Sequence, residues 1–250
     1  MISIKNSEQL KLMRVAGRIT GEALLVGAEA LRDGVSTKEI DRRIRAYIEK
    51  CGARPSFLGY GGFPGSACIS INNEVIQGIP SDNRVVKDGD IVKIDVGACY
   101  RGYHGDSART FAVGHVSETA QKLIDVTREG FYQGVGFARA GNRVGDVGSA
   151  VERYVASNGF SVVRKYVGHG VGSDLHEDPE VPNFGTAGRG ARLYAGMTIA
   201  IEPMVNVGTA DVRVLKDGWT VLTADGKLSA HYEHTVLITD EEPILLTDVG

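Results

Sequence analysis

The chain has 250 residues and a formal net charge of −3 at pH 7, with 42% hydrophobic and 24% charged residues. This length allows a sizeable buried core, and the composition is not that of a disordered or low-complexity chain. The small net charge gives no reason to expect nucleic acid as a partner, and no apolar run approaches the roughly 18 residues of a membrane span. We therefore expect residues 1–250 to form a single globular domain with no membrane partner and no specificity for nucleic acid.

The cysteines indicate a reducing compartment. Cys51, Cys68 and Cys99 are odd in number, widely spaced and form no Cys-x-x-Cys motif. A disulfide framework or a thiolate zinc site is therefore not expected. The N-terminus also lacks the basic and apolar segments of a secretory signal, so we expect the protein in the cytoplasm.

Two helices are predicted at the start of the chain. Asn6 and Gln9 have the spacing of a capping box, which predicts a helix to about Leu31. A second capping box, Ser36-Thr-Lys-Glu39, opens a helix that Gly52 ends. Their expected inward faces are Leu12, Val15, Ile19, Ala23, Val26 and Ala30 in the first helix, and Ile40, Ile44, Tyr47 and Ile48 in the second.

A predicted hairpin brings two acids together. After a Gly-rich loop at 59–65 and a strand at Ala67–Ile71, the runs Ile91–Gly97 and Ser107–Val113 are typical of strands joined by a Gly-rich turn. This pairing places Asp95 and Asp106 close together on neighbouring strands. Two carboxylates at close range are costly unless they share a proton or a cation lies between them, so the pair suggests a metal site.

The second half of the chain repeats the pattern of the first half. Gly34 and Gly141, Gly52 and Gly159, Gly89 and Gly196, and Asp95 and Glu202 are each separated by 107 positions. A helix is again expected from Ser117, and another ends at Gly159. We therefore predict two helix-helix-strand halves related by a pseudo-twofold axis, with an acid from each half meeting at the axis. Chance alignment of glycines is the alternative, because the chain has 33 of them.

Further metal-ligand types follow on predicted strands. His169 lies among glycines, Glu202 ends the strand that starts at Met197, and Glu233 lies in a strand expected over His231–Thr239. Carboxylates with a single imidazole suit two divalent metal ions, Mn, Fe, Co or Zn, better than one structural zinc.

These residues resemble a known family, the type I methionine aminopeptidases with the pita-bread fold. The resemblance covers nearly the whole chain and rests on the set Asp95, Asp106, His169, Glu202 and Glu233. It also includes four sequence motifs: Gly168-His-Gly-Val-Gly172, Ile199-Ala-Ile-Glu-Pro203, Asp217-Gly-Trp-Thr220 and Ser229-Ala-His-Tyr-Glu-His-Thr235. It implies an α/β (α+β) pita-bread fold, with a central antiparallel sheet.

The resemblance also implies roles for the five ligands. Asp95 is expected to chelate one metal, His169 and Glu202 to bind the other, and Asp106 and Glu233 to bridge both. A hydroxide held between the two ions is then expected to attack the scissile carbonyl, which makes Glu202 part of the catalytic set. His176 is expected to contact the scissile amide and stabilise the intermediate.

The other histidines match no family ligand, and we expect His104, His115, His231 and His234 to be structural or exposed. Strand parity nevertheless puts His231 on the face of Glu233.

An apolar slot for the substrate side chain is implied by the same match. Its expected walls are Tyr60, Phe63, Cys68 and Trp219, with Phe57 nearby; the alternative is that they are ordinary core aromatics. Two residues depart from the family pattern. Gln77 stands in Gln77-Gly-Ile-Pro80 where the family has histidine, so this substrate-binding position lacks a group that carries a proton. Leu175 replaces an aromatic residue beside the slot.

The predicted function is removal of the initiator methionine from nascent proteins and peptides, with a preference for a small second residue. The expected partners are nascent polypeptide N-termini; contact with the ribosome is left open, and we expect a monomer. Two alternatives remain. One is an aminopeptidase P or prolidase, families that resemble this chain only in their C-terminal half. The other is a weakly active or non-catalytic peptide-binding paralogue, to which only Gln77 points.

Overall fold

The computed structural model describes residues 2–250 and contains four long helices. Three of them begin at a residue whose side chain caps the helix. Asn6 forms the predicted capping box with Gln9, and the Ser36 and Ser117 side chains accept from backbone amides three residues on. The carboxylate of Glu39 bonds Arg43 rather than completing the second predicted box. The helices are α1 Ser7–Glu29, α2 Thr37–Lys50, α3 Glu118–Val135 and α4 Val144–Ser157, with a short 3₁₀ helix at Tyr60–Gly62.

The buried face of α1 matches the predicted stripe only in part: Ile19, Ala23 and Ala30 are buried as expected. Met13, Gly17 and Leu24 are buried, whereas the predicted Leu12, Val15 and Val26 are only partly buried. A Cβ on Gly17 would lie 2.3 Å from the Leu246 carbonyl oxygen, and one on Gly21 would lie 2.3 Å from that of Thr247. Close approach of the chain at 246–247 therefore accounts for the burial of Gly17 and Gly21, which hydrophobic spacing alone does not reveal.

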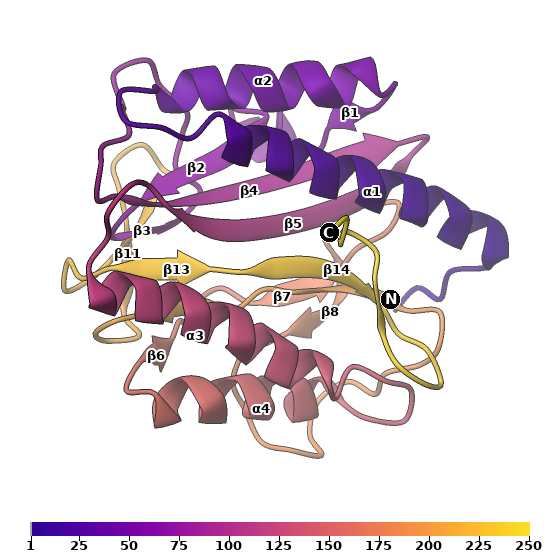
Figure 1. The fold of residues 1–250 in the computed structure, drawn as a ribbon. Helices are drawn as coiled ribbons and strands as arrows, with labels where there is room; N and C mark the ends of the chain where they lie inside the picture. The colour runs from indigo at the N-terminus through magenta and orange to yellow at the C-terminus, as the bar shows by residue number, and fades with distance from the viewer. Residues whose placement is uncertain (1) are drawn as a thin grey trace.

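Nine strands form the main sheet of the described residues. Its order is β1-β4-β5-β14-β9-β7-β8, with β2 paired to β4 and β15 to β14, and the pairs are antiparallel. Figure 1 shows α1 and α2 along the half that contains β4 and β5, and α3 and α4 along the other half. The strands of the main sheet and of the smaller sheets together are β1 Arg54–Pro55, β2 Ala67–Ile71, β3 Glu74–Ile76, β4 Ile91–Tyr100, β5 Tyr103–Ala112, β6 Ser161–Val162, β7 Gly168–Gly170, β8 Glu177–Val181, β9 Thr198–Ile201, β10 Met204–Asn206, β11 Val212–Val214, β12 Val221–Thr223, β13 Ser229–His231, β14 Glu233–Leu237 and β15 Ile244–Leu245.

The predicted hairpin is present and longer than expected. In β4 and β5, Gly97 pairs with Asp106 and Asp95 pairs with Ala108. Asp95 and Asp106 are therefore diagonal neighbours on one face of the sheet. The hairpin packs directly under α1, because a Cβ on Gly105 would lie 2.8 Å from the Cα of Gly17.

The strand predicted over His231–Thr239 is two strands. β13 pairs with β10, β14 pairs with β5 and β9, and the chain changes partners at Tyr232, whose N–H donates to the Pro203 carbonyl. The alternation of residues along the chain predicted a strand but not this change of partner, which depends on where β10 lies.

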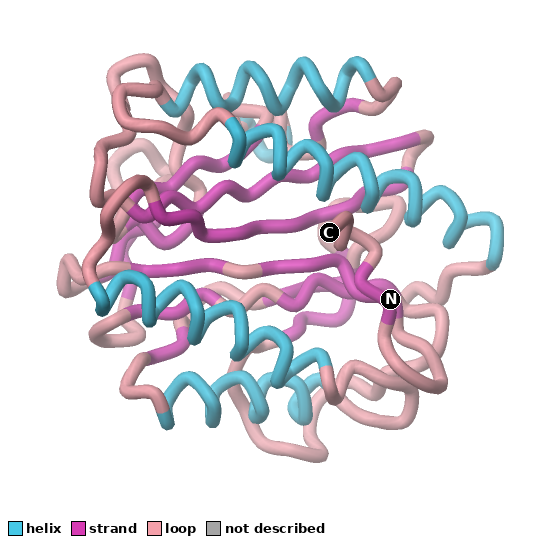
Figure 2. The backbone as a smooth tube through the Cα atoms, viewed as in Figure 1, coloured by secondary structure: helices cyan, strands magenta, loops and turns pink. Residues whose placement is uncertain are grey.

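The internal repeat is visible in the backbone. The glycine pairs at the 107-residue spacing all have positive φ: 83° and 94° at Gly34 and Gly141, and 89° and 88° at Gly89 and Gly196. The tube in Figure 2 shows the two helix pairs on either side of the strands that contain the acids. The shared sign of φ at the matched glycines and the arrangement of the two helix pairs agree with the predicted repeat of the two halves. None of the helices in residues 2–250 is long and apolar enough to cross a membrane.

Candidate metal and peptide site

All the predicted site residues line one cavity of about 160 Å³. Its floor carries the five ligand-type side chains, and its walls carry the aromatic and sulfur-containing residues. The full set is Phe57, Tyr60, Gly61, Phe63, Cys68, Ile76, Gln77, Asp95, Asp106, His169, Leu175, His176, Glu202, Trp219 and Glu233.

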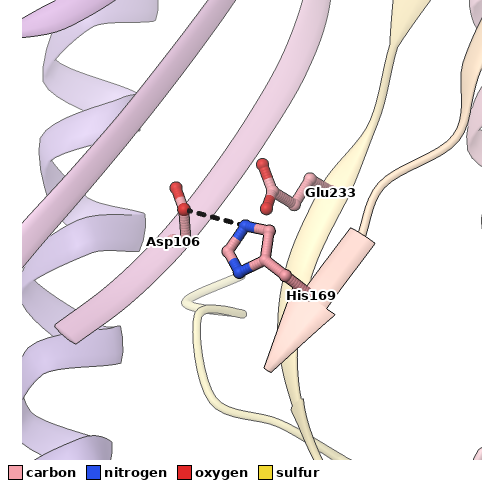
Figure 3. Close-up of side chains that lie close together, drawn as sticks. All are labelled: Asp106, His169 and Glu233. Atoms are coloured by element: carbon pink, nitrogen blue, oxygen red, sulfur yellow. Dashed lines mark ion pairs between the residues drawn. The ribbon is translucent and has the colours of Figure 1, made fainter. Parts of the chain in front are cut away.

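Neighbouring strands bring the ligand-type groups together. Asp106 on β5, His169 on β7 and Glu233 at the start of β14 point toward one another (Figure 3), and each offers a ligand atom within 4.8 Å of the other two. His169 Nε2 lies 3.8 Å from Asp106 Oδ2 and 3.5 Å from Glu202 Oε1. Asp95 reaches the same cavity from the neighbouring position of β4. Both halves of the repeat therefore contribute to one centre.

Burial makes it unfavourable for all four carboxyl groups of the site to be ionised at once. It raises the pKa of Asp95 to about 7 and that of Glu202 to about 8. Burial, followed by the charges of nearby carboxylates, holds the pKa of Asp106 and that of Glu233 well above the usual range. Buried like charges of this kind need shared protons or cations, so the site is built to bind positive charge.

The donor set fits divalent metal ions. Asp106 Oδ1 is buried with no hydrogen-bond partner among the described residues, which leaves a free ligand atom. His169 Nδ1 lies 2.8 Å from the Gly170 carbonyl oxygen, an arrangement that puts the proton on Nδ1 and leaves Nε2 as a ligand. Burial also lowers the pKa of His169 to about 3, so the ring is neutral at physiological pH. Oxygen ligands with a neutral imidazole match first-row divalent ions.

His176 lies at the mouth of the cavity. Its Nδ1 is 2.8 Å from the Tyr60 hydroxyl, and its ring centroid is 4.0 Å from that of His169. Loss of water on the side that faces the cavity lowers the pKa of His176. His169 and His176 also line a second groove with Asp174, Glu177 and Asp178. The mouth therefore connects the metal-type centre with a path along the surface.

The apolar wall is a real pocket rather than part of the general core. Phe63 and Trp219 meet edge to face with centroids 5.2 Å apart, and Phe57, Cys68 and Leu175 pack with them in one small cluster. Cys68 pairs with Asp95 across β2 and β4, which joins the apolar wall to the acids. A cavity of about 150 Å³ can hold a benzene-sized group, so this one accommodates a single side chain.

His231 is the site neighbour that sequence reasoning did not assign. It is 1% exposed, and its Nε2 lies 3.6 Å from Glu202 Oε2 and 3.9 Å from Glu233 Oε2. Burial lowers its pKa to about 4. The sequence signal that could have identified it was strand alternation, which puts His231 on the same face as Glu233. The other three match expectation: His104 bonds Ser56, His234 bonds Thr247 and His115 is exposed.

Comparison with known proteins identifies the family. A model of metallopeptidase family M24 matches residues 11–240. The chain belongs to metallopeptidase family M24. Within this M24 family, the chain is 56% identical over 247 residues to the methionine aminopeptidase of Clostridium perfringens, covering 99% of each chain. The solved methionine aminopeptidase of Thermotoga maritima is 43% identical with a TM-score of 0.98, and the match covers 99% of this chain and 100% of that one.

These matches confirm the type I methionine aminopeptidase resemblance and its pita-bread fold. This M24 enzyme is a metallo-exopeptidase that removes N-terminal methionine. The prolidase of Pyrococcus furiosus is 24% identical with a TM-score of 0.81, and the match covers 66% of that chain. That likeness shows the fold alone and gives no support to hydrolysis next to proline.

Proposed function

We propose that this methionine aminopeptidase acts through two divalent metal ions held by five side chains. Asp95 would chelate one ion, His169 and Glu202 would bind the other, and Asp106 and Glu233 would bridge them. The observation that supports this division most strongly is the convergence of Asp106, His169 and Glu233 within 4.8 Å. When bound, two such ions polarise a carbonyl oxygen and lower the pKa of a water.

The protein supplies position and charge around that chemistry. The four carboxylates attract positive charge to their part of the cavity, so they would also attract the charged amino terminus of a peptide. Glu202 lines the cavity with the other ligand-type side chains, and its ionised carboxylate would take a proton from an attacking water. His176, fixed by the Tyr60 hydroxyl at 2.8 Å, would donate to the scissile carbonyl oxygen as negative charge develops there.

The shape of the cavity accounts for the proposed specificity. An apolar slot beside the acids suits the unbranched, polarizable methionine side chain, and sulfur interacts favourably with aromatic rings such as Phe63 and Trp219. The next residue of the peptide would lie beside the His169 and His176 rings, which contact each other with centroids 4.0 Å apart. A bulky second side chain would crowd these rings, so we propose a preference for small ones.

The residue at position 77 affects the turnover that we expect. Its amide can donate and accept a hydrogen bond, but it cannot carry a proton to the leaving group. We therefore propose that Gln77 binds substrate without acid-base work and that turnover is lower than with histidine at this position.

The proposed substrates are the N-termini of nascent polypeptides, encountered in the cytoplasm. The three cysteines are all free, which agrees with a reducing compartment. We propose Mn, Fe, Co or Zn as the ions, since all four accept carboxylate and imidazole ligands.

A peptide series tests this function. The enzyme is freed of metal with a chelator, reloaded with Mn²⁺ or Co²⁺, and given Met-Ala, Met-Val and Met-Leu peptides together with an Ala-Pro peptide. We expect methionine release to be fastest from Met-Ala, slower from Met-Val and negligible from Met-Leu. Cleavage of the Ala-Pro peptide at a comparable rate would contradict the proposed specificity, and full activity without metal would contradict the proposed mechanism.

A further inference from the structure

The buried imidazole ring of His231 makes no hydrogen bond with the described residues. It is 1% exposed, and neither Nδ1 nor Nε2 has a hydrogen-bond partner among the described residues. Leaving a buried polar group unpaired costs about 1–3 kcal/mol, so such a group calls for an explanation.

The position of the ring suggests that function. Nε2 lies 3.6 Å from Glu202 Oε2 and 3.9 Å from Glu233 Oε2. The other oxygen of Glu202, Oε1, lies 3.5 Å from His169 Nε2, so the Glu202 carboxylate stands between two imidazoles. A movement of under 1 Å would bring either carboxylate within hydrogen-bond distance of His231, and such contacts commonly tighten when a site is filled.

The backbone of His231 is fixed independently of its ring. The Thr110 hydroxyl accepts from the His231 N–H and donates to the His231 carbonyl, both at 2.9 Å. His231 also pairs with Met204 across β13 and β10. The point from which the side chain extends is therefore fixed, and His231 is not among the residues that line the cavity.

We propose that His231 is a positioning residue that donates from Nε2 to Glu202 and Glu233 and holds these two carboxylates in the orientation that binds metal. This inference rests on the proposed metal site and extends it. His231 acts through the two acids rather than as a sixth ligand. Partners of this kind change metal affinity by about 10- to 100-fold when they are removed.

The test is metal binding, measured by calorimetry with Mn²⁺ on metal-free protein, together with thermal unfolding of the metal-free form. His231→Gln keeps an N–H donor, and His231→Leu removes it. His234→Leu is the matched control, because His234 is equally buried, lies three residues away, and bonds Thr247 at 2.7 Å on the other side of the strand. We expect His231→Leu to weaken Mn²⁺ binding by about 10- to 100-fold, and His231→Gln by less than about threefold. His234→Leu should lower the unfolding temperature and leave Mn²⁺ affinity unchanged.

Two results would overturn the inference. Native Mn²⁺ affinity in His231→Leu would mean that the ring only fills space. Equal weakening in the Gln and Leu variants, with loss of one bound ion per chain, would mean that His231 is a ligand. If His231→Leu does not fold, His231→Asn replaces it, because its shorter amide falls short of both acids. Failure of the wild type to bind Mn²⁺ would instead contradict the proposed function.

Discussion

The two halves of the molecule share a backbone but differ in the groups they bring to the site. In the first half, Asp95 lies inside the ten-residue strand β4, and the hairpin partner β5 adds Asp106. In the second half, Glu202 follows the four-residue strand β9, and the neighbouring strand β7 adds His169. Glu233, at the start of β14, which pairs with β9, completes the contribution of the second half. The repeated turns determine where the strands run, and the halves differ in the side chains they place in the site: two aspartates from the first half, and two glutamates with an imidazole from the second.

The largest effect should come from removing one acid from either side. Asp106→Asn and Glu202→Gln keep side-chain shape but remove a charge, and we expect each to lower kcat/KM for a Met-Ala peptide by about 10³-fold or more. Metal content, measured by atomic absorption on the same samples, should fall as well. Full activity with an unchanged metal count in Asp106→Asn would show that the first half is not needed for the chemistry.

His176→Ala should cost about 10²- to 10³-fold in kcat with unchanged metal content, because the residue stabilises developing charge without binding the ions. Tyr60→Phe is the control, since it removes only the 2.8 Å contact that fixes His176. We expect the Tyr60 variant to lose about tenfold or less. Steady-state kinetics on Met-Ala peptide separates kcat from KM, and an equal loss in both variants would assign the role to Tyr60 instead.

Gln77→His would give the first half an imidazole of its own and so make the two halves more alike. We expect kcat to rise about tenfold, since proton transfer by a positioned side chain contributes about 10²- to 10⁴-fold in other enzymes. Gln77→Asn keeps an amide and should give no gain. If the histidine variant is no faster than wild type, the glutamine does not limit turnover.

The stability of the metal-free protein should fall as pH rises. The folded-state pKa is about 7 for Asp95 and about 8 for Glu202, against model values of 3.8 and 4.5. These two acids therefore hold more protons in the folded protein than in the unfolded chain between about pH 4 and 8. The buried histidines oppose them at lower pH, because burial lowers the pKa of His169 to about 3 and that of His231 to about 4 from an ordinary value of 6.5. The free energy of unfolding is therefore expected to decrease with pH between about 6.5 and 8, by about 1.4 kcal/mol per pH unit per excess proton.

Thermal unfolding at pH 6.5, 7 and 8, with and without Mn²⁺, measures this dependence. The stabilisation by Mn²⁺ should grow with pH, because the metal competes with protons for the same oxygens. Asp95→Asn should flatten the metal-free slope. A metal-free unfolding temperature that rises from pH 6.5 to 8 would show that the acids are ionised without metal.

The smallest effects test the equivalence of the halves directly. Gly34 and Gly141 have φ of 83° and 94° with open space around them, so an alanine at either position meets only backbone strain. We expect Gly34→Ala and Gly141→Ala each to cost about 1–2 kcal/mol in urea unfolding. Gly136→Ala, at φ −54°, should be neutral or slightly stabilising. Clearly unequal costs would show that the turns are alike in geometry but not in energetic role.

Local sequence was enough to predict much of this molecule. The caps at Asn6, Ser36 and Ser117 depend on neighbours a few residues away, and the acids of the hairpin follow from strand alternation and a Gly-rich turn. Helical spacing correctly placed Ile19 and Ala23 on the buried face of α1. The burial of Gly17 and Gly21 could not be predicted, because it depends on carbonyls more than two hundred residues away. The break at Tyr232 likewise depends on Pro203, and the distance from His231 to Glu202 exists only once β13 and β9 are in place.

The close contact between α1 and residues 246–247 also bears on how the molecule is made. Gly17 and Gly21 lie against carbonyls of residues 246 and 247, and Gly17 also lies against the hairpin that bears Asp95 and Asp106. Translation proceeds from the N-terminus, so α1 is synthesised long before residues 246 and 247. Its packing is incomplete until those residues are available. An enzyme that removes the first residue of other chains thus completes the packing of its own first helix only after residues 246 and 247 have been synthesised.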